Sequence, residues 1–246
     1  MAFNSILAFF IGASLLVIGA FASGPASVCS AGKSQSPVDI NTYLSPINKT
    51  LEPLDRQYSS LDVQKATLVC DGKHLEISLN GNGGLKIYGK PYNLRQLLFH
   101  TPSEHRLNSV PYAAEVQQVH EAPDGSRAVV AILFKYGPPS PFIDMLMPQL
   151  EQLAKKPCPG NEQRIDIPKF DLSFLRKWPR DYYRYLGSNT SPPCTENVIW
   201  NVLSEAKTIS AAQVTALSAP LCQENKNNAR PVQPLNGRKV QVYDEV

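Results

Sequence analysis

Long apolar runs and clusters of charge are both scarce in this sequence. After the first 22 residues, no apolar run approaches the roughly 20 residues that a membrane-spanning helix needs. The net charge is only +3, and no run of Lys or Arg typical of nucleic-acid binding occurs. Internal repeats and low-complexity segments are lacking too. These absences argue against a later membrane helix, a nucleic-acid partner and a repeat architecture.

The first 22 residues differ from the rest of the chain. They contain no charged side chain, and residues 6–22 are almost entirely apolar. Ala20 and Ala22 flank Phe21 in a small-x-small cleavage pattern. The segment 1–22 is therefore predicted to be a secretory signal peptide, although its start lacks the usual Lys or Arg. An uncleaved signal anchor is the alternative, because the run is near bilayer-spanning length. After cleavage we expect a secreted or lumenal protein without membrane attachment.

Cysteine and glycosylation patterns agree with the secretory pathway. Five cysteines follow residue 22, and disulfides persist in secreted proteins. They are Cys29, Cys70, Cys158, Cys194 and Cys222. The odd number leaves one thiol over, and spacing alone does not fix the pairing. Asn48 begins the acceptor pattern Asn-Lys-Thr, and we expect it to be glycosylated. A second pattern at 189–191 is followed by Pro192 and is not expected to be used.

Length and patterning predict one β-rich domain over residues 23–246. A hydrophobic content of 43% suffices for a core in a chain of 246 residues. Short runs with turn signals between them predict strands at 66–70, 74–79, 85–88, 96–101, 113–120 and 128–136. Apolar residues at helical spacing predict a helix over 142–156, in which Pro148 is either a kink or the first turn of a second helix. Residues 210–217 form another helical candidate.

Four motifs in order give the chain a specific resemblance. They read QSPVDI at 35–40, QLLFHTPSEH at 96–105 leading to YAAEVQQVH at 112–120, GSNTSPPC at 187–194 and NARPVQPL at 228–235. Together they resemble the α-type carbonic anhydrases. The resemblance implies a mainly β (α+β) fold, with a twisted central sheet of about ten mostly antiparallel strands and short peripheral helices. It also implies a disulfide between Cys29 and Cys194.

The positions that match the family's zinc ligands are Leu98, His100 and Gln117. Side chains alternate along a strand, so Leu98 and His100 share one face, and Gln117 on the paired strand meets them there. His120 points to the opposite side and cannot replace Gln117. His105 matches a buried structural histidine of the family. A catalytic zinc needs three protein ligands and an open position for water, and only one imidazole is present.

Two missing imidazoles weaken such a site severely. Structural zinc sites contribute about 10–16 kcal/mol over four ligands, so losing two costs roughly 5–8 kcal/mol, or about four to six decades in affinity. The amide oxygen of Gln117 is a poor substitute for imidazole, and Leu98 offers no ligand atom. We therefore expect no metal cofactor; zinc is the cofactor only in the alternative hypothesis.

The groups that surround the zinc in the family are partly retained. Thr190 and Glu104 match a pair in which the carboxylate orients the Thr hydroxyl. Glu115 matches the carboxylate that receives an N–H from a ligand His. Here the Gln117 amide is placed to donate to Glu115 instead. Lys73 takes the place of the proton-shuttle His, and an ammonium with a pKa near 10 shuttles protons poorly at neutral pH. We expect Thr190, Glu104 and Glu115 to be vestigial.

The sequence thus favours a secreted carbonic anhydrase-like protein without catalytic zinc or CO2 hydration. Its role would be binding, storage or interaction with a small molecule or a protein that the sequence does not identify. A zinc-dependent carbonic anhydrase with an atypical or weak metal site is the alternative. A third hypothesis, another chemistry such as ester hydrolysis in the same cleft, lacks support because no Ser-His-Asp or Cys-His arrangement is visible.

Overall fold

A computed structural model describes residues 29, 32–58, 63–79, 83–158, 160–177 and 180–245. The predicted signal peptide at 1–22 lies outside these residues. Within them, no helix is both long and apolar enough to cross a membrane.

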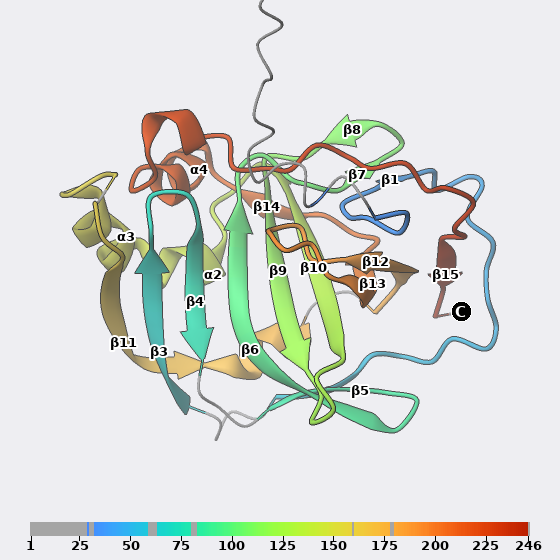
Figure 1. Ribbon diagram of the computed structural model, residues 1–246. Coiled ribbons are helices and arrows are strands. Elements are labelled where there is room, and N and C mark those ends of the chain that lie inside the picture. Colours follow the sequence, from blue (N-terminus) through green and yellow to red (C-terminus); the bar gives the residue numbers. More distant parts are fainter. Residues whose placement is uncertain are drawn as a thin grey trace, which may run out of the picture.

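A twisted twelve-stranded sheet dominates the fold. Its main path runs from left to right in Figure 1 in the order β11-β3-β4-β6-β9-β10-β13-β12-β15. These strands are β3 (Val63–Cys70), β4 (Leu75–Leu79), β6 (Lys90–His100), β9 (Ala114–Glu121), β10 (Arg127–Tyr136), β11 (Gln163–Asp171), β12 (Tyr182–Ser188), β13 (Glu196–Leu203) and β15 (Gln241–Tyr243). Off this path lie β2 (Asp55–Gln57), β5 (Gly84–Ile87) and β14 (Lys207–Ile209). A separate small sheet holds β1 (Asp39–Ile40), β7 (Arg106–Leu107) and β8 (Val110–Pro111).

The mainly β fold class with a large twisted sheet is confirmed, and the sheet holds twelve strands where about ten were expected. The sequence analysis found no strands in the regions of β11, β12 and β13. In β12 and β13, charged, Asn or Gly positions interrupt the apolar residues and shorten the two-residue period. In β11, Ile165 and Ile167 do alternate with polar residues, but Pro168 and a register shift end the pattern. Most pairs are antiparallel, but β10 pairs in parallel with both β13 and β14.

The helices are short and lie at the periphery (Figure 1). They are α2 (Pro141–Asp144), α3 (Met147–Ala154) and α4 (Ala211–Ser218), with 3-10 turns η1 (Leu172–Lys177) and η2 (Gln223–Asn225). The helix predicted over 142–156 is two helices, and Pro148 stands in the first turn of the second, where a missing N–H costs nothing. Helix α4 begins with a reciprocal capping box between Ser210 and Gln213.

Apolar side chains cover both faces of the sheet. On β6, Leu97 and Phe99 pack into the same core as Leu150 and Leu153 of α3. A second core on the opposite face is built around Trp200 of β13, and Leu98 packs against it. The strand period therefore places Leu98 on the face away from α3, as the sequence predicts.

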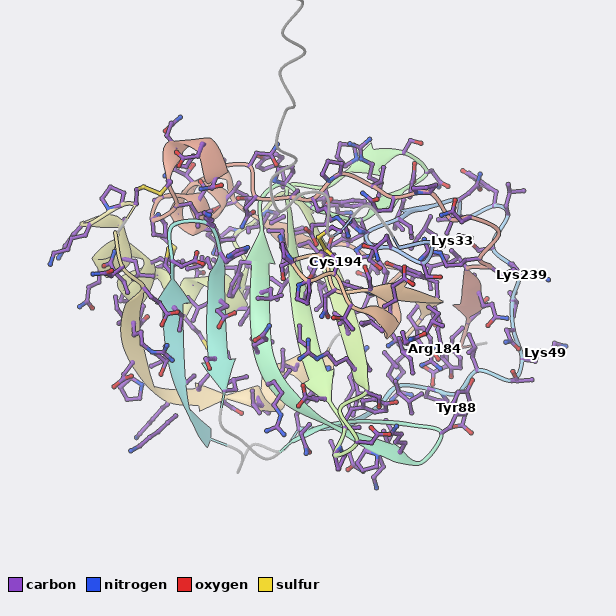
Figure 2. The ribbon with its side chains drawn as sticks, viewed as in Figure 1. Lys33, Lys49, Tyr88, Arg184, Cys194 and Lys239 are labelled. Carbon is purple, nitrogen blue, oxygen red and sulfur yellow. A yellow bond between two sulfur atoms is a disulfide. The ribbon has the colours of Figure 1, made fainter. Side chains whose placement is uncertain are left out.

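Two disulfides tie distant segments together. Cys29 joins Cys194 with a Cα–Cα distance of 5.2 Å, which is the pairing that the family resemblance implies. Cys158 joins Cys222 with a Cα–Cα distance of 4.2 Å. Cys70 is the thiol left over, and it is completely buried. Cys194 lies in the middle of the molecule in Figure 2.

His120 on β9 is buried on the helix-covered side, away from Gln117. Its Nδ1 donates to the Ala128 carbonyl at 3.3 Å, so its Nε2 accepts from the Tyr58 hydroxyl at 2.5 Å. Burial disfavours the charged imidazolium and lowers the pKa of His120 to about 3.

We expect the stability of the protein to fall as the pH drops below about 6.5, because the unfolded chain protonates His120 before the folded one does. Above pH 6.5, His120 is neutral in the folded and the unfolded chain, and its full contribution to the free energy of unfolding is present. Between pH 6.5 and about 3, the free energy of unfolding falls by up to about 1.4 kcal/mol per pH unit. Urea unfolding at a series of pH values checks this. His120→Gln should flatten the pH slope, whereas His74→Gln at an exposed site should not; equal slopes in both variants contradict the assignment.

Candidate functional site

The register of β6 and β9 brings the three predicted ligand positions together. Leu98 lies directly opposite Gln117, and His100 lies opposite Glu115 in the antiparallel pair. His100 and Gln117 are buried, while Leu98 is half-buried. The structure thus assembles Leu98, His100 and Gln117 on one face, as strand alternation predicts.

Glu115 is the buried hydrogen-bond centre of this region. Its Oε2 accepts the backbone N–H groups of Glu104 and His105 at 2.9 and 2.7 Å, and its Oε1 lies 2.8 Å from His105 Nδ1. His105 Nε2 lies 2.6 Å from the Tyr185 hydroxyl. Burial alone would raise the pKa of Glu115, but attraction and hydrogen bonds from His105 outweigh it and keep the pKa below its ordinary value. His105 is completely buried and structural, in agreement with the resemblance.

Gln117 bridges two carboxylates. Its Nε2 donates to Glu104 Oε2 at 2.6 Å and to Glu115 Oε1 at 3.0 Å. Both neighbouring groups are acceptors, so the amide nitrogen must face them. The expected donation from Gln117 to Glu115 is therefore present, together with a shorter bond to Glu104.

The expected pair of Thr190 and Glu104 is absent among the described residues, which corrects the sequence analysis. Glu104 Oε2 is taken by Gln117, and Glu104 Oε1 accepts the backbone N–H of Arg230 at 2.9 Å. Both carboxylate oxygens of Glu104 thus accept hydrogen bonds from groups other than the Thr190 hydroxyl. Thr190 lines the same cleft, half-buried and without a side-chain hydrogen bond to a described residue.

His100 is the retained imidazole of the site. Its Nδ1 lies 3.3 Å from the Asn228 carbonyl and 3.4 Å from Glu104 Oε1. Both are acceptors, so Nδ1 carries the hydrogen. The other ring nitrogen, Nε2, is buried and has no hydrogen-bond partner in the described part of the chain. Asn228 also fixes the end of β6. Its Oδ1 accepts the Thr101 N–H, and its Nδ2 donates to the Phe99 carbonyl.

A cleft of about 450 Å³ opens above these residues. Leu98, His100, Glu104 and Thr190 line it. Its walls also contain Glu76 and Gln96 on the strand positions beside Leu98, and Lys73, His74, Pro192 and Arg230 on the surrounding loops. Burial raises the pKa of the Glu76 carboxyl, and repulsion from Glu162 adds to the shift.

Residues from three of the motifs contact one another around the cleft. Arg230 Nη1 donates to the Ser36 carbonyl at 2.6 Å, and its Nη2 donates to the Cys29 carbonyl at 3.1 Å. Gly187 lies near the end of β12, just before the loop that carries Thr190, and a Cβ there would lie 2.1 Å from Ser36 Oγ. The close approach of the N-terminal segment therefore requires glycine at 187.

The residues present do not fit a catalytic zinc ion. One buried imidazole nitrogen, on His100, is available where three protein ligands are needed. Leu98 has no donor atom, and Gln117 could offer only a neutral amide oxygen, which is a poor substitute for an imidazole. Among the described residues, the only close group of three candidate ligand side chains is Cys158, Cys222 and Glu224, and the two cysteines form a disulfide.

Comparison with known proteins identifies the family. The family model described as eukaryotic-type carbonic anhydrase matches residues 23–244. The chain belongs to the α-carbonic anhydrase family. Dioscorin dioA3 of Dioscorea japonica is 36% identical over 89% of this chain and 78% of its own length. Alpha carbonic anhydrase 7 of Arabidopsis thaliana is 37% identical over 88% of this chain and 76% of its own.

Solved structures give the same result for this α-carbonic anhydrase family member. The crystal structure of dioscorin complexed with ascorbate has a TM-score of 0.82 and 34% identity, and the match covers 90% of each chain. The α-carbonic anhydrase of Photobacterium profundum has a TM-score of 0.75 and 35% identity, over 87% of this chain and 92% of that one. Relatives named dioscorin and relatives named carbonic anhydrase are thus about equally similar, so similarity alone does not decide activity.

Sequence analysis missed several residues that build this carbonic anhydrase-family site. Asn228 and Arg230 were quoted only as part of a motif, although both contact the site. Glu76 was missed, yet it is the direct partner of Leu98 in the pairing of β4 with β6. The alternation used for β6 would have found it, had the same reasoning been applied to the neighbouring strand.

Proposed function

We propose that this protein is a carbonic anhydrase-like protein that holds no catalytic zinc and does not hydrate CO2, and that it serves as a binding or storage protein of the secretory pathway. The observation that carries the proposal is the single available imidazole nitrogen, that of His100. The Leu98 and Gln117 positions cannot supply the other two ligands, for the reasons of chemistry and hydrogen bonding given above.

The electrostatics of the site support the same conclusion. In the zinc-bound family, a ligand imidazole donates its second N–H to a carboxylate such as Glu115. Here Gln117 makes that hydrogen bond as a neutral amide, so Glu115 is satisfied without any metal. Among the buried side-chain atoms of this network that the structure describes, only His100 Nε2 lacks a hydrogen-bond partner.

The relatives support a role in binding small molecules. The dioscorin structure contains ascorbate, and its fold matches this chain more closely than that of the Photobacterium enzyme. The cleft of about 450 Å³ is of the size that small-molecule sites use. We therefore place the binding role of this protein in the cleft above His100.

A zinc-dependent carbonic anhydrase with a weak metal site is the second candidate. Its support is the retention of Glu104, Glu115 and Thr190 around the cleft, together with relatives named carbonic anhydrase.

Protein purified without added metal is expected to be free of zinc and to hydrate CO2 no faster than the buffer. The physical reason is the estimated loss of about four to six decades in zinc affinity. Zinc is measured by elemental analysis, and hydration by stopped flow with and without a sulfonamide inhibitor. Stoichiometric zinc together with inhibitor-sensitive hydration would establish the second candidate instead.

Secretion belongs to the proposal. The two disulfides are consistent with an oxidising compartment. Asn48 lies in a surface loop, where its Oδ1 accepts the N–H and hydroxyl of Thr50 at 2.9 and 2.8 Å. Its amide nitrogen donates to no described residue, which leaves it accessible for modification.

We expect secreted material from a eukaryotic host to carry one N-glycan, at Asn48. Peptide-N-glycosidase should lower the apparent mass, and Asn48→Gln should abolish that change. Asn189→Gln serves as the matched control and should leave the mass shift intact. A shift that survives Asn48→Gln and disappears in Asn189→Gln would refute the assignment.

A further inference from the structure

The cleft above His100 has a chemistry that selects among small molecules. We infer that it binds an uncharged, hydroxyl-rich small molecule, such as a cyclic polyol or a monosaccharide, in preference to an anion. The inference rests on the proposed function, because a bound zinc ion would change both the charge of the cleft and the role of His100.

His100 Nε2 provides the first argument. His100 lines the cleft with only 6% of its surface exposed, and its Nε2 is buried without a hydrogen-bond partner in the described part of the chain. With the hydrogen of Nδ1 directed at the Asn228 carbonyl and Glu104, an uncharged ring leaves a lone pair at Nε2. A buried acceptor without a partner is costly, and a ligand hydroxyl would satisfy it. An ionised carboxylate oxygen, which is only an acceptor, would not.

The charges around the cleft provide the second argument. Four described acidic side chains line the cleft, so an anion there would meet four carboxylates: Asp71, Glu76, Glu104 and Glu162. The Arg230 guanidinium offsets only part of this negative charge, and two of its N–H groups already donate to the carbonyls of Cys29 and Ser36. His74 is paired with Asp71 at 3.0 Å. A zinc ion would reverse this balance, since bound metals are often the largest charges in a site.

Lysines that would attract anions lie mostly elsewhere. Figure 2 shows Lys33, Lys49 and Lys239 in the right-hand part of the molecule, near β15. In the sheet order, β15 is at the end opposite to β11, β3 and β4, and β4 carries Glu76. Lys73 is the exception, at the rim of the cleft.

The remaining walls suit a ring with one polar and one apolar face. Gln96 and Thr190 line the cleft with side chains that make no hydrogen bond to a described residue, and they offer both donors and acceptors. Leu98 and Pro192 add apolar surface. Cyclic polyols and sugars carry hydroxyls at the ring edge and C–H groups on the ring face, so one molecule can use both surfaces.

The test titrates zinc-free protein with myo-inositol, D-glucose and D-mannitol, and with ascorbate and bicarbonate as anionic probes. Calorimetry gives the affinities, and long-range ¹H–¹⁵N spectra follow His100 Nε2. We expect at least one polyol to bind with a Kd below about 1 mM, to shift the Nε2 resonance, and to bind at least about tenfold more tightly than either anion.

Charge variants sharpen the test. Glu76→Lys should raise the affinity for ascorbate at least about tenfold, which corresponds to one decade in Kd. Glu205→Lys makes the same change in net charge at an exposed position outside the cleft, and it should leave ascorbate binding unchanged. Should Glu76→Lys fail to fold, Glu76→Gln should still raise the ascorbate affinity, by a smaller factor.

Three results would overturn the inference: tighter binding of either anion than of every polyol, polyol binding that leaves His100 Nε2 unshifted, or no polyol with a Kd below about 1 mM. Elemental analysis of the same sample separates the two proposals. Zinc in the protein refutes the proposed function, whereas zinc-free protein with any of these three results refutes only the preference for uncharged polyols.

Discussion

The double variant Leu98→His with Gln117→His is expected to bind zinc stoichiometrically and to gain measurable CO2 hydration. Both side chains lie in register on β6 and β9, so imidazoles there would join His100 on one face. Two restored ligands should raise the zinc affinity by about four to six decades over that of the unchanged protein. Zinc stoichiometry by elemental analysis and hydration by stopped flow provide the measurements.

The hydrogen bonds of the site refine this expectation. Replacing Gln117 removes the amide that bridges Glu104 and Glu115, and an imidazole at 117 can donate its free N–H to Glu115 instead. Glu104 Oε2 is then released for the Thr190 hydroxyl. Hydration should remain below that of a complete enzyme, since Lys73 is a poor proton shuttle.

The single variants are the controls for this experiment. Leu98→His and Gln117→His each leave two imidazoles, which is fewer than a catalytic zinc site needs, so neither should retain zinc through dialysis. If the folded double variant also binds no zinc, the assignment of Leu98, His100 and Gln117 to the ligand positions is wrong.

Removal of the Cys29–Cys194 disulfide is expected to lower stability by about 5 kcal/mol, because the bridge closes a long loop in the unfolded chain. The sequence separation is 165 residues. For a domain of this size the loss corresponds to a decrease in Tm of roughly 10–20 °C. Thermal unfolding of the variant Cys29→Ser with Cys194→Ser measures it.

The second bridge offers a matched comparison. Cys158 and Cys222 are 64 residues apart, so Cys158→Ser with Cys222→Ser should cost less, about 4 kcal/mol. A larger loss from the shorter loop would contradict the loop-entropy explanation. The Cys29 bridge also holds the segment whose backbone Arg230 contacts, and this contact should add to the difference.

The two-residue period made the placement of Leu98, His100, Gln117 and His120 predictable. It depends only on which face of a strand a side chain occupies, and the register of β6 with β9 preserves that relation. Helix boundaries near Pro148 were only partly predictable, because a proline is compatible with a kink as well as a new helix.

Competition between side chains was not predictable. Thr190 and Glu104 occur at the positions that resemble a hydrogen-bonded pair, but a carboxylate has few oxygen sites and Gln117 takes one of them. The pairing of Cys158 with Cys222 was unpredictable for a related reason. It depends on the approach of η2 and the loop after α3, two segments that no local pattern places together.

The completely buried Cys70 thiol can be used to measure local opening of the structure around it. It is the one free cysteine among the described residues, enclosed between the Gly72 N–H at 3.4 Å and the Pro220 carbonyl at 3.7 Å. Burial raises its pKa, so both access and thiolate formation depend on opening of the surrounding structure. Labelling by an aromatic disulfide reagent will thus follow the opening equilibrium at the end of β3. Local fluctuations beside the cleft can be timed in the natural sequence, without introducing a probe.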